Sequence, residues 1–106
     1  MPGTTEEFFN GLEQRFRSDK ATGLSAVYQF VITGEGGGAW TATLVDGACT
    51  VAAGQAADPS LTLTTSVSNW ERILGGDLDP QLAFMTGRLR IKGDMGLAMR
   101  LRSLFL

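Results

Sequence analysis

The chain contains two kinds of apolar pattern, one with a helical period and one with strict alternation. Apolar residues recur every four positions from Phe8 to Phe16, after a capping-box pattern formed by Thr4 and Glu7. This pattern predicts a first helix over residues 4–18.

Four segments in the first two thirds of the chain are rich in β-branched and aromatic residues that alternate with polar or small ones. The Asp46-Gly47 pair is typical of a tight hairpin turn. The first three segments therefore predict a meander, and a fourth strand follows after Asp58-Pro59. The expected strands cover residues 25–34, 40–45, 48–53 and 61–64.

Ser66, Asp79 and Asp94 each precede an apolar run and are good N-cap residues. They predict three helices, and Leu89 and Ile91 alternate with basic residues in a fifth strand. The expected helices cover residues 67–74, 80–86 and 95–106, and the strand covers 88–92. The fold class is α+β, a five-stranded mixed sheet covered by helices.

The last predicted helix has an unusually wide apolar surface. Its apolar residues span roughly 220° of the helix, against about 100° or more for an ordinary surface helix. One side can pack on the sheet, and the remainder must meet a ligand, a partner subunit or another helix. Met95 and Met99 suit an adaptable surface.

The length of 106 residues predicts a single domain over residues 1–106, and 43% hydrophobic residues are enough for a core. The absence of histidine removes the commonest catalytic base and metal ligand. The single cysteine, Cys49, excludes disulfides within the chain and CxxC sites, and we expect it to be a buried structural thiol. We therefore expect no catalytic residues, no metal and no enzyme activity.

The Gly34-x-Gly36-x-x-Ala39 spacing is similar to that of a dinucleotide-binding loop. That loop requires a helix to follow, so that the phosphates meet its N-terminus, whereas residues 40–45 alternate as a strand. The spacing therefore favours a hairpin, and we expect no cofactor.

The net charge of −2 and a pI near 4.9 argue against a nucleic-acid partner. Arg88, Arg90 and Lys92 nevertheless form one basic strand face, with Arg100 and Arg102 nearby in sequence. Such a face is either simply solvated or makes transient contact with an anionic membrane surface. No apolar run is long enough to span a bilayer and the N-terminus is acidic, so we expect a cytoplasmic protein.

The segment GDLDPQLAFMTGRLRIKGDM at residues 76–95 resembles the signature of the sterol carrier protein 2 (SCP-2) family. Its pattern is Gly-x-Leu-x-Pro, an Ala-Phe pair, and then Gly-[Lys/Arg]-Leu-x-Ile-x-Gly-[Asp/Asn]-Met. Upstream, an Ile-Thr-Gly strand end, Trp40, Asp46-Gly47 and Trp70 agree with the family, so the resemblance covers about residues 5–106.

The resemblance implies a sheet and helices that enclose a hydrophobic tunnel for sterols, fatty acids, acyl-CoAs or phospholipids, without catalysis. Eukaryotic members often end in a Ser-Lys-Leu type tripeptide, whereas this chain ends Leu104-Phe105-Leu106. The ending resembles that of a stand-alone bacterial-type member.

We therefore expect non-catalytic binding and transfer of lipids. The alternative is an accessory protein that presents a lipid or quinone precursor to a partner enzyme through the apolar C-terminal helix. The expected lipid-binding residues are mostly large and apolar, with Gln81 as a polar contact: Phe30, Ile32, Trp40, Trp70, Leu74, Leu78, Gln81, Leu82, Phe84, Met85, Met95, Met99 and Leu104.

Overall fold

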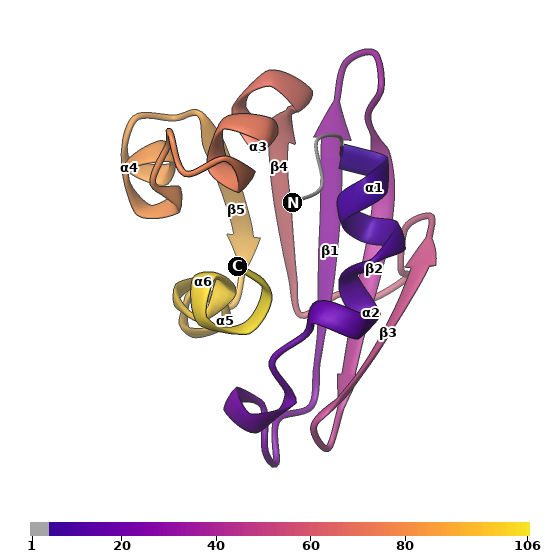
Figure 1. The fold of residues 1–106 in the computed structure, drawn as a ribbon. Coiled ribbons are helices and arrows are strands. Elements are labelled where there is room, and N and C mark those ends of the chain that lie inside the picture. Colours follow the sequence, from indigo (N-terminus) through magenta and orange to yellow (C-terminus); the bar gives the residue numbers. More distant parts are fainter. Residues whose placement is uncertain (1–4) are drawn as a thin grey trace.

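The computed structural model describes residues 5–106, which form a five-stranded sheet with helices packed against it (Figure 1). The strands lie in the order β3-β2-β1-β4-β5. β1 pairs in parallel with β4, while the other neighbours are antiparallel, so the expected mixed sheet is confirmed. The bounds are β1 (Ala26–Thr33), β2 (Gly38–Val45), β3 (Ala48–Ala53), β4 (Leu61–Ser66) and β5 (Leu89–Gly93).

The three expected N-caps are confirmed. Ser66, Asp79 and Asp94 each accept a hydrogen bond from the backbone N–H three residues on, at 3.1 Å. The helices are α1 (Thr5–Asn10), α2 (Leu12–Arg15), α3 (Val67–Leu74), α4 (Pro80–Met85), α5 (Met95–Met99) and α6 (Leu101–Phe105), with a 3-10 turn, η1, at Ser18–Lys20.

The N-terminal helix is shorter than predicted. Gly11 separates α1 from α2, and the chain becomes extended at Phe16. Glycine inside a helix costs about 0.5–1 kcal/mol relative to alanine, which favours a break there. The capping box at Thr4 lies outside the described residues.

The prediction of one continuous C-terminal helix is wrong. At Arg100 the backbone N–H bonds to the carbonyl of Leu97, a tighter three-residue turn that ends α5 before α6 begins. The Arg100 guanidinium also donates to the carbonyl of Lys20 at 2.7 Å. The roughly 220° apolar arc is therefore divided between two short helices, of which only α6 buries side chains.

The core lies between β1 and the helices that cross it. Phe30 on β1 contacts Phe9 of α1, with ring centroids 5.1 Å apart. It also contacts Trp70 of α3 at 5.8 Å and Phe105 of α6 at 5.7 Å. Elements from both ends of the chain therefore cover the same face of the sheet.

The corner between β5 and α5 depends on Gly93. This residue pairs with Leu61 of β4 and has a φ of +114°. A Cβ at this position would lie 2.6 Å from the Ser60 carbonyl oxygen and 2.7 Å from the Leu61 Cα. Only glycine fits there without moving backbone, and Asp94 caps α5 immediately afterwards.

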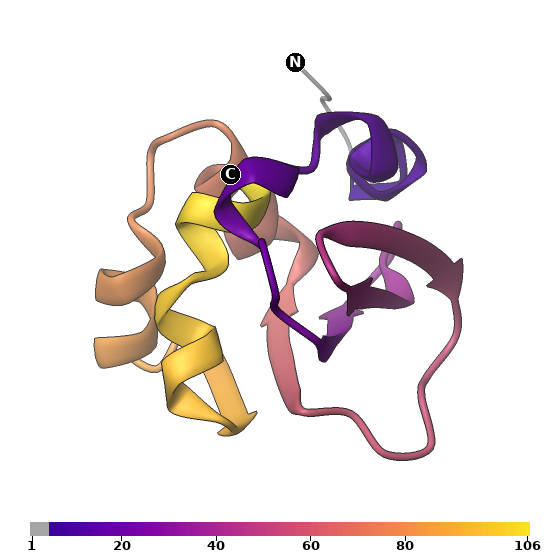
Figure 2. The same cartoon turned by 90° about the horizontal axis from the view of Figure 1, so that it is seen from below.

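α4, α5 and α6 lie together on the β5 side of the sheet, as the two perpendicular views in Figures 1 and 2 agree. Direct contacts join α4 to β5 and α5 to both β4 and β5. This group of short elements surrounds the candidate site.

Candidate functional site

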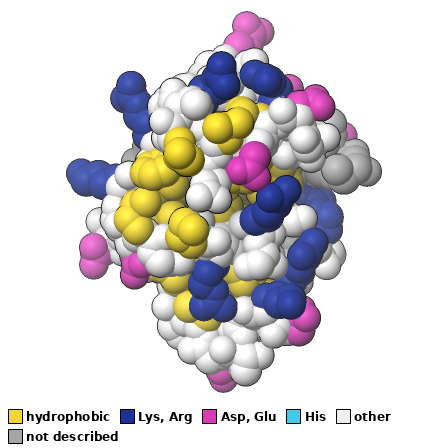
Figure 3. All heavy atoms as spheres, turned by 90° about the vertical axis from the view of Figure 1, so that its left-hand side faces the viewer, with side chains coloured by type: hydrophobic (Ala, Val, Ile, Leu, Met, Phe, Trp, Pro, Cys, Tyr) yellow, Lys and Arg dark blue, Asp and Glu magenta, His cyan; other side chains and the backbone are white. Residues whose placement is uncertain are grey.

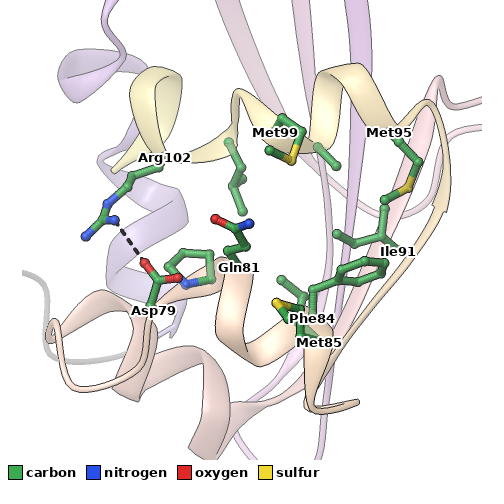
Figure 4. A pocket seen from close by; sticks show the side chains of 12 residues that line it. Asp79, Gln81, Phe84, Met85, Ile91, Met95, Met99 and Arg102 are labelled. Carbon is green, nitrogen blue, oxygen red and sulfur yellow. Dashed lines mark hydrogen bonds and ion pairs between the residues drawn. The ribbon is translucent and has the colours of Figure 1, made fainter.

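A cavity of about 270 Å³ lies between α4, β5, α5 and α6 (Figure 4). Most of its wall is apolar, and two charged side chains and one amide complete it. The lining residues are Asp79, Pro80, Gln81, Phe84, Met85, Leu89, Ile91, Met95, Ala98, Met99, Leu101 and Arg102.

Local periodicity explains why the two short helices present these side chains. The Asp79 cap followed by Pro80 starts α4, so residues 81, 84 and 85 fall on one helical face. The Asp94 cap starts α5 in the same way and places residues 95, 98 and 99 on one face. β5 contributes Leu89 and Ile91, two positions apart on the same side of the strand.

A hydrogen bond from Tyr28 holds α5 against the sheet. Its hydroxyl donates to the Leu97 carbonyl at 2.6 Å and links the central strand of the sheet to the helix. Burial raises the pKa of Tyr28 to about 12, while the charge of Arg100 lowers it and that of Asp94 raises it. The phenol therefore remains a neutral donor throughout the physiological range.

The cavity has a polar end and an apolar end. Arg102 and Asp79 form an ion pair at 2.9 Å at one end, and Gln81 lies between this pair and the apolar side chains (Figure 4). The side chains of Arg102 and Asp79 are 72% and 41% exposed, and such an exposed pair contributes only about 0–1 kcal/mol. The Gln81 amide makes no hydrogen bond within residues 5–106, so it is available to a ligand.

A second cavity, of about 390 Å³, adjoins the polar end. Asp79, Pro80 and Arg102 line both cavities. The other lining residues of the second cavity are Phe8, Arg15, Arg17, Ile73, Leu74, Gly76, Leu78, Phe105 and Leu106. A continuous tunnel through both remains a prediction.

The structure gathers some of the expected site residues and separates others. Those that line the first cavity are Gln81, Phe84, Met85, Met95 and Met99, and those that line the second are Leu74 and Leu78. Leu82 is 50% exposed and lines neither. The remaining expected residues pack in or against the core: Phe30, Ile32, Trp40, Trp70 and Leu104.

Several residues that line the first cavity are not among those expected from the sequence: Asp79, Pro80, Leu89, Ile91, Ala98, Leu101 and Arg102. Alternation along β5 and the four-residue period after Met95 were available signals for Leu89, Ile91 and Ala98. Nothing in the sequence indicated that Arg102 would reach Asp79, because their proximity depends on the break at Arg100.

Cys49 is half-buried, not fully buried as expected. Burial, and then the nearby charge of Glu13, raises the pKa of its thiol to about 11. A thiol that stays protonated at neutral pH is a poor nucleophile. Within residues 5–106, no group of three or more Cys, Asp or Glu side chains is arranged to hold a metal ion.

Together, the α+β fold and the largely apolar cavity define a small binding domain for apolar ligands. A family model described as the SCP-2 sterol transfer family matches residues 9–106, and the chain belongs to this family. Membership identifies it as a lipid-binding and transfer domain.

The chain is 34% identical over 103 residues to hydroxysteroid dehydrogenase-like protein 2 of Bos taurus, covering 96% of this chain. That stretch is 25% of the relative, so the chain spans about a quarter of the length of such relatives.

Two solved structures share the fold. Palmitated SCP2L2 from Aedes aegypti has a TM-score of 0.77 and 24% identity, covering 94% of this chain and 92% of that one. The stereoselective inverting sec-alkylsulfatase Pisa1 from Pseudomonas sp. has a TM-score of 0.81 and 23% identity, covering 96% of this chain but 16% of that one. No helix among the described residues is long and apolar enough to cross a membrane.

Proposed function

We propose that the chain binds the apolar part of a lipid in the first cavity and transfers it without catalysing a reaction. The observation that carries this proposal is the wall of Phe84, Met85, Ile91, Met95 and Met99 around a volume of about 270 Å³. Such a wall favours ligands by excluding water from apolar surface, which requires no reactive group.

An acyl chain is the first ligand class to test. Small-molecule sites usually span about 300–1,000 Å³, so this cavity is near the lower limit and suits a flexible chain better than a rigid sterol. Each buried methylene contributes about 0.8 kcal/mol, before the costs of ordering and association. Methionine side chains can adjust to chains of different length. The palmitated Aedes aegypti neighbour supports the same choice.

The polar end gives the ligand an orientation. We place the lipid head near Gln81 and Arg102 and the tail toward Phe84 and Met95 (Figure 4). Because the ion pair between Arg102 and Asp79 is exposed and weak, an anionic head group can replace Asp79 as the partner of Arg102.

A second candidate function is presentation of a lipid or quinone precursor to a partner enzyme. It is favoured by the comparisons, in which the matching segment is a minor part of a dehydrogenase-like protein and of a sulfatase. In this version the docking surface is α5 with α6. Native mass spectrometry separates the two, because presentation predicts a stoichiometric protein partner, whereas simple lipid transfer predicts a retained lipid and no such partner.

The test is to fill the cavity. Ala98→Phe projects a ring into the space between α4 and α5, and should weaken binding of a fluorescent fatty acid at least about tenfold, which is about 1.4 kcal/mol. The measurement is a titration of the probe, followed by displacement with palmitate and with cholesterol.

The matched control is Ala53→Phe, the same change at an exposed position at the end of β3. It should leave probe affinity unchanged. If Ala98→Phe keeps both its thermal midpoint and full affinity, lipid binding in this cavity must be abandoned.

A further inference from the structure

Four large apolar side chains are exposed around the opening of the first cavity. Phe84 and Met85 of α4 are 39% and 73% exposed, and Met95 and Met99 of α5 are 43% and 69% exposed. We name these four residues the mouth patch. Among the described residues, the other exposed large apolar side chains are Val45 and Leu82. A contiguous apolar patch with polar surroundings typically marks an interaction surface.

The charges of the chain are divided unevenly. Residues 80–106 carry Arg88, Arg90, Lys92, Arg100 and Arg102 but only one acidic residue, Asp94, for a formal charge of +4. The rest of the chain carries −6. The positive charge is therefore concentrated in the segment that forms the mouth patch.

The basic side chains of β5 lie at the edge of the sheet, on the strand that also lines the cavity. Leu89 and Ile91 face the cavity, so Arg90 and Lys92 project from the other side of the same edge. Both are exposed and form no ion pair among residues 5–106. Figure 3 shows the hydrophobic side chains gathered on this face, with Lys and Arg side chains on several sides of them.

We infer that the mouth patch and the basic residues of β5 form a docking surface for an anionic lipid bilayer. The apolar side chains enter the boundary between head groups and acyl chains, and Arg90 and Lys92 contact the anionic head groups. A bilayer meets both chemistries at once and imposes no particular shape, which suits long flexible side chains.

This docking surface rests on the proposed function, because the bound ligand is the lipid proposed above, and it identifies the bilayer as the source of that lipid. All four residues of the mouth patch also line the cavity. When the protein is docked, its cavity therefore opens directly onto the bilayer. A lipid can then enter or leave without exposing its chain to water.

The test is cosedimentation with sucrose-loaded vesicles of phosphatidylcholine alone or of an equal mixture with phosphatidylserine. Binding should be restricted to the mixed vesicles and should weaken at high salt. The double variant Arg90→Gln plus Lys92→Gln should weaken binding by about 30-fold, because each basic residue near such a surface contributes about 1 kcal/mol.

The matched control, Lys20→Gln plus Arg72→Gln, removes the same charge from two exposed positions outside residues 80–106 and should bind almost as the parent does. An equal loss in both double variants would overturn the inference, because only net charge would then matter. So would failure of the parent protein to bind mixed vesicles. If fatty-acid binding measured without vesicles is then normal, the proposed function survives and the mouth patch meets a protein partner instead.

Discussion

Two regions of the molecule are built from similar residues but are packed differently. We call the region around β1, in the middle of the sheet, the packed side, and the region around β5, at its edge, the open side. Around β1, Phe9, Phe30 and Trp70 are at most 2% exposed, and their rings pack against one another. Around β5, Met95 and Met99 are 43% and 69% exposed and border a cavity. A large apolar residue in this chain is therefore either packed in the core or left at the cavity, according to which strand it lies beside.

Position in the sheet accounts for the difference. β1 has eight residues and lies in the middle of the sheet, with three helices crossing the same face. β5 has five residues at the edge, and its neighbours α4 and α5 have six and five residues. Because β5 has a neighbouring strand on one side only, fewer elements converge on it, and the cavity lies between it and these helices.

The largest effect is expected from truncating the packed side. Phe30→Ala should lower the free energy of unfolding by about 3–5 kcal/mol, because it leaves a cavity among Phe9, Trp70 and Phe105. Met85→Ala on the open side should change it by about 0.5 kcal/mol or less. Chemical denaturation measures both, with Phe30→Leu as a milder variant if Phe30→Ala does not fold. Equal losses would remove the distinction between the two sides.

The double variant Met95→Ala plus Met99→Ala is expected to have the opposite balance, with a large effect on lipid affinity and a small effect on stability. Lipid affinity should fall by about tenfold or more, because both side chains line the cavity. The stability cost should stay below the roughly 2–5 kcal/mol per residue typical of a buried methionine, since both are exposed. Titration of the fluorescent fatty acid is paired with denaturation of the ligand-free variant. Unchanged affinity with a loss of several kcal/mol would make these residues part of the core.

The smallest effect is expected where the two sides meet, at the hydrogen bond from Tyr28 to the Leu97 carbonyl. Tyr28→Phe should cost about 0.5–1.5 kcal/mol at neutral pH, measured by denaturation. Because the folded pKa of about 12 exceeds the ordinary value of 10.0, this group contributes stability that is present below pH 10.

That contribution is lost as the pH rises from 10 toward about 12, where the unfolded chain releases the Tyr28 proton first. Tyr28→Phe should lack this part of the pH dependence. A parallel alkaline decline in both proteins would assign the loss to other groups.

Most of the fold could be predicted from the sequence, because its signals are local. The caps at Ser66, Asp79 and Asp94 determine where helices begin, and the Asp46-Gly47 turn joins β2 and β3 as expected. The break at Arg100 could not be predicted, since it involves a hydrogen bond to Lys20, eighty residues away.

The site was less accessible to sequence analysis for a related reason. Leu104 and Met99 occur on similar apolar patterns, yet Leu104 is buried and Met99 borders the cavity. Only the change of direction between α5 and α6 separates them. Trp40 and Trp70, expected to border a ligand, pack with Phe9 instead, so an added probe is a better reporter than tryptophan emission.

Gly93 limits how this cavity can diversify during evolution. Since any side chain there would collide with the backbone of Ser60 and Leu61, a substitution at Gly93 would disturb the corner that leads into α5. We therefore expect a change of ligand preference to arise more readily by exchanging exposed lining side chains on α4 and α5, such as Gln81, Met85 and Met99, than by changing this corner. Libraries aimed at new ligand preferences should randomise those positions and keep Gly93 constant.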